Sequence, residues 1–489
     1  MRRREIGFLL LLTFGALLIH GYHPRAEDAE IYVPAIVRIF HPSYYPFGRE
    51  FFEANSHLTL FPHLIAWTVR STHLSLDWAL FLWYLTSIFL LIFASWKIAS
   101  KCFLTAAGRW SAVTMVAALL TLPVAGTSLY IFDEYLNPRS ISAFAVLFAI
   151  DAALEKKYPL TALWLAITAV FHPFMTVFGL FFIALLVILE KLPRRSAPTS
   201  AAMLFPFLSV SRIFGKEPSA AFWQCLRDHR YYFLLRWEWY EWLGILAPLA
   251  FLWWFARIAR RRGNPVFERL TEAVFVFEAI CFVFGLIVTI PRSLEILAPY
   301  QPMRSLQLVY LLFFLFVGGL LGEFMLKNHL VRWLLLFIPL CAGLCFAQLQ
   351  LFPGTRHVEW PGAAPENPWL EAFVWIRGNT PPGAIFALDP NYMALPGENY
   401  QGFRANAERS RLADAKKDWS AAVLYPWLPL ADDCLAQVRA ANGWKNFGLA
   451  DFEGLRKTYD VTWVVVQPPA ATGLSCAYQN AAVAVCRIE

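Results

Sequence analysis

Long runs of apolar residues recur along this chain and constrain its fold more than any other feature. Hydrophobic residues make up 58% of the 489 residues, which is more than a soluble domain carries. A helix needs roughly 18–20 apolar residues to cross a bilayer. The runs therefore predict a polytopic α-helical membrane protein with about eleven spans, at residues 6–20, 76–97, 110–129, 139–154, 160–171, 174–189, 199–211, 242–257, 268–290, 305–325 and 331–349.

Basic residues cluster on one side of these predicted spans. Cytoplasmic loops of membrane proteins carry such an excess of Lys and Arg. A cytoplasmic N-terminus puts every cluster on that side: Arg2 to Arg4, Lys97, Lys101, Arg109, Lys156, Lys157, Lys191, Arg194, Arg195, Arg257, Arg260 to Arg262, Lys327 and Arg332. The first long loop and the C-terminal tail then lie outside. The net charge of +7 thus comes largely from loops that set the topology, and it does not indicate nucleic acid as a partner.

The segment 159–190 is too long for one span, and His172-Pro173 lies in its middle. Because proline breaks a helix, we expect two short helices that enter from and return to the cytoplasmic side. The alternative is one span kinked at Pro173, which would invert every later span. An ionisable residue at membrane depth is a functional candidate, so His172 is either a site residue or a neutral cap of a helix end.

The composition changes from Pro353 onward, where no run is long enough to span. Asn367 followed by Pro368 predicts a helix start. A short strand at 384–388 follows, and a second helix–strand unit is expected at 450–466. We therefore predict a transmembrane domain over 1–350 and an α/β domain over 351–489.

The eight cysteines show no CxxC pair and no His/Cys cluster, which argues against a zinc or iron–sulfur site. Three of them lie in the tail: Cys434, Cys476 and Cys486. If the tail is exported, one pair among them could form a disulfide. The sequence leaves the pairing open.

The first loop, over 21–75, is long enough to suggest a function. Two amphipathic patterns in it, one from Tyr32 to Phe40 and one from Leu58 to Val69, predict helices lying flat on the membrane. Three acids open the loop: Glu27, Asp28 and Glu30. A carboxylate at the membrane boundary can act as a general base or hold a divalent cation. The alternative is that these acids only complement a helix dipole.

Further candidates lie in loops predicted on the same outer side. Asp133 and Glu134 precede Asn137-Pro138-Arg139, which reads as a capped helix start. An Arg there opposes the helix dipole, so Arg139 binds either an anion or one of the two acids.

Three other arginines are candidates for anion binding. Arg292 and Arg304 flank one loop and suit a lipid phosphate or act as interfacial anchors. Arg404 belongs, with Arg409 and Arg411, to a basic group in the tail that faces either the cavity or water.

The layout resembles the GT-C class of integral-membrane glycosyltransferases, which includes protein mannosyltransferases, oligosaccharyltransferases and aminoarabinose transferases. The shared features are an uncleaved first span, a long first outer loop with acids, many spans and an outer C-terminal domain. The tail, with WIRGNTPPGAIFALDP, GFRANAERS and YDVTWVVV, is similar to bacterial members of that general design.

The resemblance implies a catalytic acid at Asp28, with Glu27 and Glu30 as competitors, and a polyprenyl-phosphate donor. By position, Arg139, Arg292 and Arg304 would hold the phosphate. We therefore expect a glycosyltransferase that acts at the periplasmic face of a bacterial inner membrane, with a lipid-linked sugar and membrane lipid as partners. A transporter or flippase of a lipid-linked saccharide, and a non-catalytic scaffold of the same fold, are the alternatives. The acceptor and any metal requirement stay open.

Overall fold

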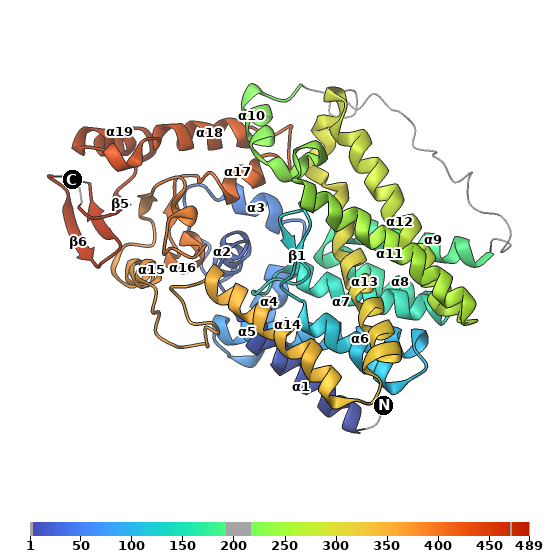
Figure 1. Ribbon diagram of the computed structural model, residues 1–489. Helices are drawn as coiled ribbons and strands as arrows, with labels where there is room; N and C mark the ends of the chain where they lie inside the picture. Colours follow the sequence, from blue (N-terminus) through green and yellow to red (C-terminus); the bar gives the residue numbers. More distant parts are fainter. Residues whose placement is uncertain (1–2, 192–216, 470–471, 489) are drawn as a thin grey trace.

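The computed structural model describes residues 3–191, 217–469 and 472–488. It combines a bundle of apolar helices with a C-terminal region that contains a sheet (Figure 1). The bundle consists of α1 (Arg3–His20), α5 (Leu76–Cys102), α6 (Ala106–Ala118), α7 (Pro138–Leu154), α8 (Tyr158–Phe171), α9 (Pro173–Lys191), α11 (Trp239–Arg261), α12 (Pro265–Thr289), α13 (Ser305–Leu321) and α14 (Leu330–Leu351).

Six helical stretches in the described part of the chain are long and apolar enough to cross a membrane, and α8 is a shorter apolar helix. The predicted count of about eleven spans is therefore not confirmed. The span predicted at 199–211 lies outside the described residues.

The span predicted at 110–129 is wrong at its C-terminal end. Helix α6 stops at Ala118, and the chain turns into an antiparallel hairpin of β1 (Pro123–Val124) and β2 (Leu129–Tyr130). Pro123 cannot donate a helical hydrogen bond, and Gly126 adopts a φ of 61°, which favours glycine. The hairpin replaces the last turns of the expected span.

Among the described residues, several of the predicted basic clusters lie close together at one end of the bundle. Lys101 pairs with Asp151 and, at 2.8 Å, with Glu155. At the same end the Asn264 amide donates to the Cys102 carbonyl at 2.6 Å, and Arg262 pairs with Glu323. The loops at the other end carry the candidate site.

Helices α8 and α9 form a hairpin broken at His172-Pro173, as expected, but only α8 is short, because the 19-residue α9 is long enough to cross a membrane. Lys156, just before α8, pairs at 2.7 Å with Glu190 near the end of α9. The tip contacts the first loop, because the Leu60 amide donates to the Val170 carbonyl at 3.0 Å. The turn at His172-Pro173 therefore lies at the loop end of the bundle.

The first loop contains three helices, where two were predicted: α2 (Ala29–Phe40), α3 (Glu50–Ser56) and α4 (Phe61–Thr72). Helix α2 does not lie flat on an exposed surface. Ile36 is fully buried and Val33 nearly so, in the main core of the bundle. The start of α2 is tied to the C-terminal region by an isolated bridge between Ala26 and Gln401. Helix α2 is thus enclosed between bundle and C-terminal region (Figure 1).

The C-terminal region is built on a five-stranded sheet of order β4-β3-β5-β7-β6. Strand β3 is parallel to β4 and β5, and β7 is antiparallel to β5 and β6. The strands are β3 (Ile385–Ala387), β4 (Ser410–Arg411), β5 (Trp463–Val466), β6 (Ser475–Gln479) and β7 (Ala484–Arg487). Its helices are α15 (Pro368–Asn379), α16 (Phe403–Ala407), α17 (Lys417–Ala422), α18 (Leu430–Ala440) and α19 (Leu449–Tyr459), and α10 (Ala220–Asp228) lies beside α17 and α18.

Local signals in this region are confirmed. The Asn367 side chain accepts from the backbone amides of Trp369 and Leu370, so it caps α15 ahead of Pro368. A disulfide joins Cys476 and Cys486 across β6 and β7. Cys434 is a buried free thiol. The structure thus selects one of the pairings that the sequence left open.

Candidate active site

A cavity of about 1380 Å³ lies where the loop end of the bundle meets the C-terminal region. Its walls come from segments far apart in the chain: the starts of α2 and α7, the β1–β2 hairpin, the α8–α9 turn, α10, the loop before α13, α17 and α18. The volume exceeds the range of about 300–1,000 Å³ usual for small-molecule sites. The cavity is therefore large enough for a ligand bigger than a typical small molecule.

Glu27 and Asp28 line this cavity just before α2, where Asp28 is the N-cap residue. Glu27 has a φ of 53°, in the left-handed region that non-glycine residues rarely adopt. Both side chains are about one-third exposed, at 31% and 32%, so substrate can reach them. Strained backbone of this kind concentrates at functional sites.

Lys417, at the first position of α17, pairs with both acids. Its Nζ lies 2.8 Å from Asp28 Oδ1 and contacts Glu27 Oε2. Burial alone would raise the pKa of Asp28, but the positive charges of Lys417, Arg139 and Arg304 outweigh it and lower the pKa to about 2. Asp28 is therefore an ionised carboxylate at neutral pH. Sequence reasoning missed Lys417, since no local pattern connects it to the first loop.

Arg139 lines the cavity and is held by Asp133. Its Nη2 lies 2.5 Å from Asp133 Oδ2, which also accepts from the Asn137 amide at 2.7 Å. Asn137 caps α7 through the backbone of Ser140, as the sequence predicted. Of the two roles left open, the structure shows the ion pair with Asp133. Both partners line the cavity, and the positive charge of Arg139 is one of those that lower the pKa of Asp28.

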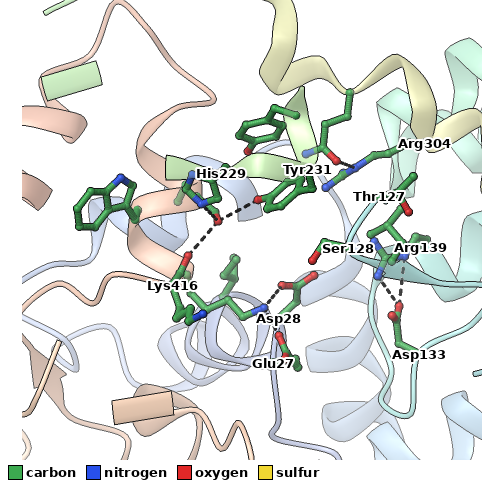
Figure 2. A pocket seen from close by; sticks show the side chains of 18 of the residues that line it. Glu27, Asp28, Thr127, Ser128, Asp133, Arg139, His229, Tyr231, Arg304 and Lys416 are labelled. Carbon is green, nitrogen blue, oxygen red and sulfur yellow. Dashed lines mark hydrogen bonds and ion pairs between the residues drawn. The ribbon is translucent and has the colours of Figure 1, made fainter. Parts of the chain in front are cut away.

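Arg304 also lines the cavity, on the wall shown beside Arg139 in Figure 2. Its Nε donates to the Gln301 side-chain oxygen at 2.8 Å. Among the described residues it has no carboxylate within ion-pair distance. An arginine without an acidic partner in a cavity is suited to bind an anionic group. Arg292, in the same loop, is exposed and lies outside the cavity, so the structure does not join it to the site.

His172 reaches the cavity at the tip of the α8–α9 hairpin. Its Nδ1 accepts from the Met175 amide at 3.4 Å, a weak cap of α9. Both roles left open by the sequence are thus compatible with its position. Phe171 and Phe174, next to it, make this part of the wall apolar.

Glu30 and Arg404 do not reach the cavity. Glu30 is fully buried and accepts from Arg411 at 2.9 Å and from the Ala405 amide at 3.1 Å. Arg404 is 1% exposed and binds both oxygens of Asp418. The tail arginines Arg404 and Arg411 therefore face neither the cavity nor water. They belong to a buried ionic cluster consisting of Glu30, Arg404, Arg411, Asp414 and Asp418.

Glu134 is the one predicted acid at the cavity wall that lacks a partner in the described part of the chain. Both of its carboxyl oxygens are buried without a hydrogen bond. Burial first, and then the nearby charge of Asp133, raise its pKa to about 8. The group is therefore mostly protonated at neutral pH, in contrast to Asp28.

The raised pKa of Glu134 makes stability depend on pH. The unfolded carboxyl has its ordinary pKa of 4.5, so the folded protein holds this proton more tightly. The contribution of this proton to the free energy of unfolding is complete below pH 4.5. It falls by about 1.4 kcal/mol per pH unit until the folded group ionises near pH 8. We expect Glu134→Gln to gain stability over the wild type as pH rises from about 5 to about 8. Melting temperatures of the purified protein across that range measure it, and a pH-independent difference would contradict the assignment.

A second polar cluster lines the cavity on the side of α10 and α17. His229 Nε2 lies 2.8 Å from Ser420 Oγ, and its Nδ1 lies 2.8 Å from the Cys225 carbonyl. The Tyr231 hydroxyl is 3.3 Å from the same Ser420 oxygen. Gln224 and Arg439, beyond this cluster, also line the cavity. This wall is polar and was missed by sequence reasoning (Figure 2).

The described residues show no cluster of side chains suited to bind a metal ion. No group of three or more His, Cys, Asp or Glu side chains there is arranged to hold a metal ion. The divalent cation considered from the sequence stays a hypothesis.

No protein-family model matches the chain. A comparison with curated proteins also found no match. Similar solved structures include the archaeal oligosaccharyltransferase AglB from Archaeoglobus fulgidus in complex with an inhibitory peptide and a dolichol-phosphate, at 12% identity and a TM-score of 0.48, over 95% of this chain and 69% of that chain. Another is the Archaeoglobus fulgidus oligosaccharyltransferase in complex with Zn and sulfate, at 13% identity and a TM-score of 0.40, over 94% and 67%. Both are oligosaccharyltransferases, a group within the class that the sequence resembles. At these values they say nothing about what this chain binds.

Proposed function

We propose that this protein is a membrane glycosyltransferase that moves a sugar from a polyprenyl-phosphate donor to an acceptor hydroxyl, at the periplasmic face of a bacterial inner membrane. One observation carries the proposal: a single cavity, at the end of the bundle opposite the basic clusters, joins Asp28, Arg139 and Arg304. A base and two cations around one cavity are what transfer from a phosphate leaving group needs.

The reaction divides among these residues. Asp28 takes the proton of the acceptor hydroxyl as its oxygen attacks the anomeric carbon. The bond from that carbon to the phosphate oxygen breaks, and its electron pair stays on the phosphate. Arg304 and Arg139 stabilise the negative charge that grows there. The apolar wall at Phe171 and Phe174 suits the first isoprene units of the carrier.

Arg304 and Arg292 provide a matched pair of variants for testing donor binding. Both arginines lie in one loop, but only Arg304 lines the cavity. We expect Arg304→Gln to raise the KM for a polyprenyl-phosphate-linked sugar about tenfold or more, because one charge-assisted hydrogen bond to the phosphate is lost. Arg292→Gln should behave as wild type. The measurement is release of polyprenyl phosphate and formation of glycosylated acceptor by purified protein.

The same assay, combined with a flux measurement in proteoliposomes, separates the proposal from its alternatives. Movement of the lipid-linked sugar across proteoliposomes without a covalent product would replace transfer with transport. Equal KM values for Arg304→Gln and Arg292→Gln would remove Arg304 from donor recognition.

A further inference from the structure

The pairing of Asp28 with Lys417 is a puzzle for the proposed chemistry. A carboxylate that is bound to an ammonium at 2.8 Å is a weak base. To accept the acceptor's proton efficiently, Asp28 has to lose this partner. Lys417 therefore has to move during the reaction, and its destination has to be another negative charge.

The position of Lys417 is set by the buried ionic cluster. Asp414 accepts from the backbone amides of Lys416 and Lys417 at 2.7 and 2.6 Å, which fixes the first turn of α17. Asp418, the next residue, binds Arg404 and Arg411, and Arg411 binds Glu30 at 2.9 Å. Glu30 lies two residues after Asp28. The cluster thus anchors both backbones that carry the pair.

The Lys417 side chain, in contrast, is free to change partner. It is 16% exposed at the cavity wall, and a lysine has an unbranched, rotatable stem that ends in three donors. Glu27, its second carboxylate, holds the ammonium near the site when it leaves Asp28. The backbone is fixed while the charged end can swing.

We propose that Lys417 is a catalytic cation that pairs with Asp28, as in the structure, and moves to the donor phosphate during transfer. This inference rests on the proposed function. The acceptor proton neutralises Asp28, while the phosphodiester of the donor becomes a phosphate monoester with one more negative charge. The total charge of the site is unchanged, but one negative charge passes from Asp28 to the phosphate. The Lys417 ammonium moves with that charge. Asp28 is then neutral and needs no cation, and the new charge on the phosphate is paired with Lys417.

A double-mutant cycle of Lys417 and Asp28 tests the movement without requiring turnover. The measured quantity is the affinity for a short-chain polyprenyl phosphate. We expect Lys417→Met to weaken binding about tenfold, the contribution of one charge-assisted hydrogen bond. Asp28→Asn should tighten binding several-fold, because the ammonium no longer has to leave a carboxylate. In the double variant the gain from Asp28→Asn should disappear. Lys417→Arg should bind nearly as wild type, and Lys457→Met, an exposed lysine on α19, serves as the matched control.

The pH dependence of transfer gives a second readout. Wild-type Asp28 stays ionised well below neutral pH, so activity should be flat down to about pH 5. Without Lys417, burial raises the pKa of Asp28, and the acid limb moves up toward or above the ordinary carboxyl range of about 4. Lys417→Met should therefore lose activity toward acid pH, and Lys417→Arg should not.

The experiments distinguish a failure of the proposed function from a failure of the Lys417 proposal. If wild-type protein transfers no sugar, the proposed function fails, while the binding cycle still decides the role of Lys417. Additive effects in the cycle, or unchanged binding in both Lys417→Met and Asp28→Asn, overturn the proposal. Asp28→Asn leaves Lys417 intact, so its result stands even if Lys417→Met does not fold.

Discussion

Asp28→Asn is expected to lower glycosyl transfer by about a hundred- to ten-thousandfold, the usual contribution of a general base. The amide keeps the shape of the side chain but cannot take the acceptor's proton. The fold should be preserved, because Lys417 keeps its ion pair with Glu27. Initial rates with saturating donor and acceptor measure the loss, and the melting temperature reports folding.

Asp432→Asn is a suitable control for that loss. Asp432 is an exposed carboxylate in the first turn of α18, outside the cavity. Its variant should transfer at the wild-type rate. Full activity in Asp28→Asn, with the control also active, would mean that another group takes the proton, and Glu27 would be the next residue to replace.

Arg411→Met is expected to destabilise the protein by about 3–5 kcal/mol, the cost of removing one partner from a buried ionic network. Arg411 is 1% exposed and binds Glu30, Asp414 and Asp418. Without it, Glu30 and Asp418 share only Arg404, and Asp414 loses the arginine it is paired with. Methionine has a similar length and flexibility, so loss of charge and hydrogen bonds dominates over loss of volume.

Thermal unfolding of the purified protein measures this effect. Arg456→Met, on the exposed face of α19, should melt as the wild type does. Adding Glu30→Gln to Arg411→Met should cost less than Glu30→Gln alone, since the carboxylate that lost its partner is gone. Two costs that simply add would show that Glu30 and Arg411 are not energetically coupled.

The sequence was a good guide wherever structure depends on neighbouring residues. Apolar runs located α5, α12 and α14, because hydrophobicity alone decides whether a helix can occupy a bilayer. The Asn137 and Asn367 caps follow from side-chain hydrogen bonds within one turn. The break at Pro173 follows from its missing donor.

The sequence was a poor guide wherever partners are distant in the chain. Lys417 and Asp28 are 389 residues apart, and Glu30 and Arg411 are 381 apart. The helix and strand periodicities of a sequence do not indicate pairs so far apart. Arg292 and Arg304 look alike in the sequence, and only the course of the intervening 3₁₀ turns, over Arg292–Tyr300, separates an exposed side chain from one in the cavity. The apolar residues around Pro123 and Gly126 favoured a span, although these two residues form a turn in the structure.

The link between Glu30 and Arg411 also sets an order of biogenesis. Ribosomes make the first loop early, and the arginines that compensate its buried acid emerge only near the end of synthesis. Until then, Glu30 has to stay hydrated, because an unpaired carboxylate is too costly to bury. Helix α2 can therefore reach its final place only after the C-terminal region has been synthesised and folded. A nascent chain stalled before residue 404 would lack Lys417 and the rest of the C-terminal wall of the cavity.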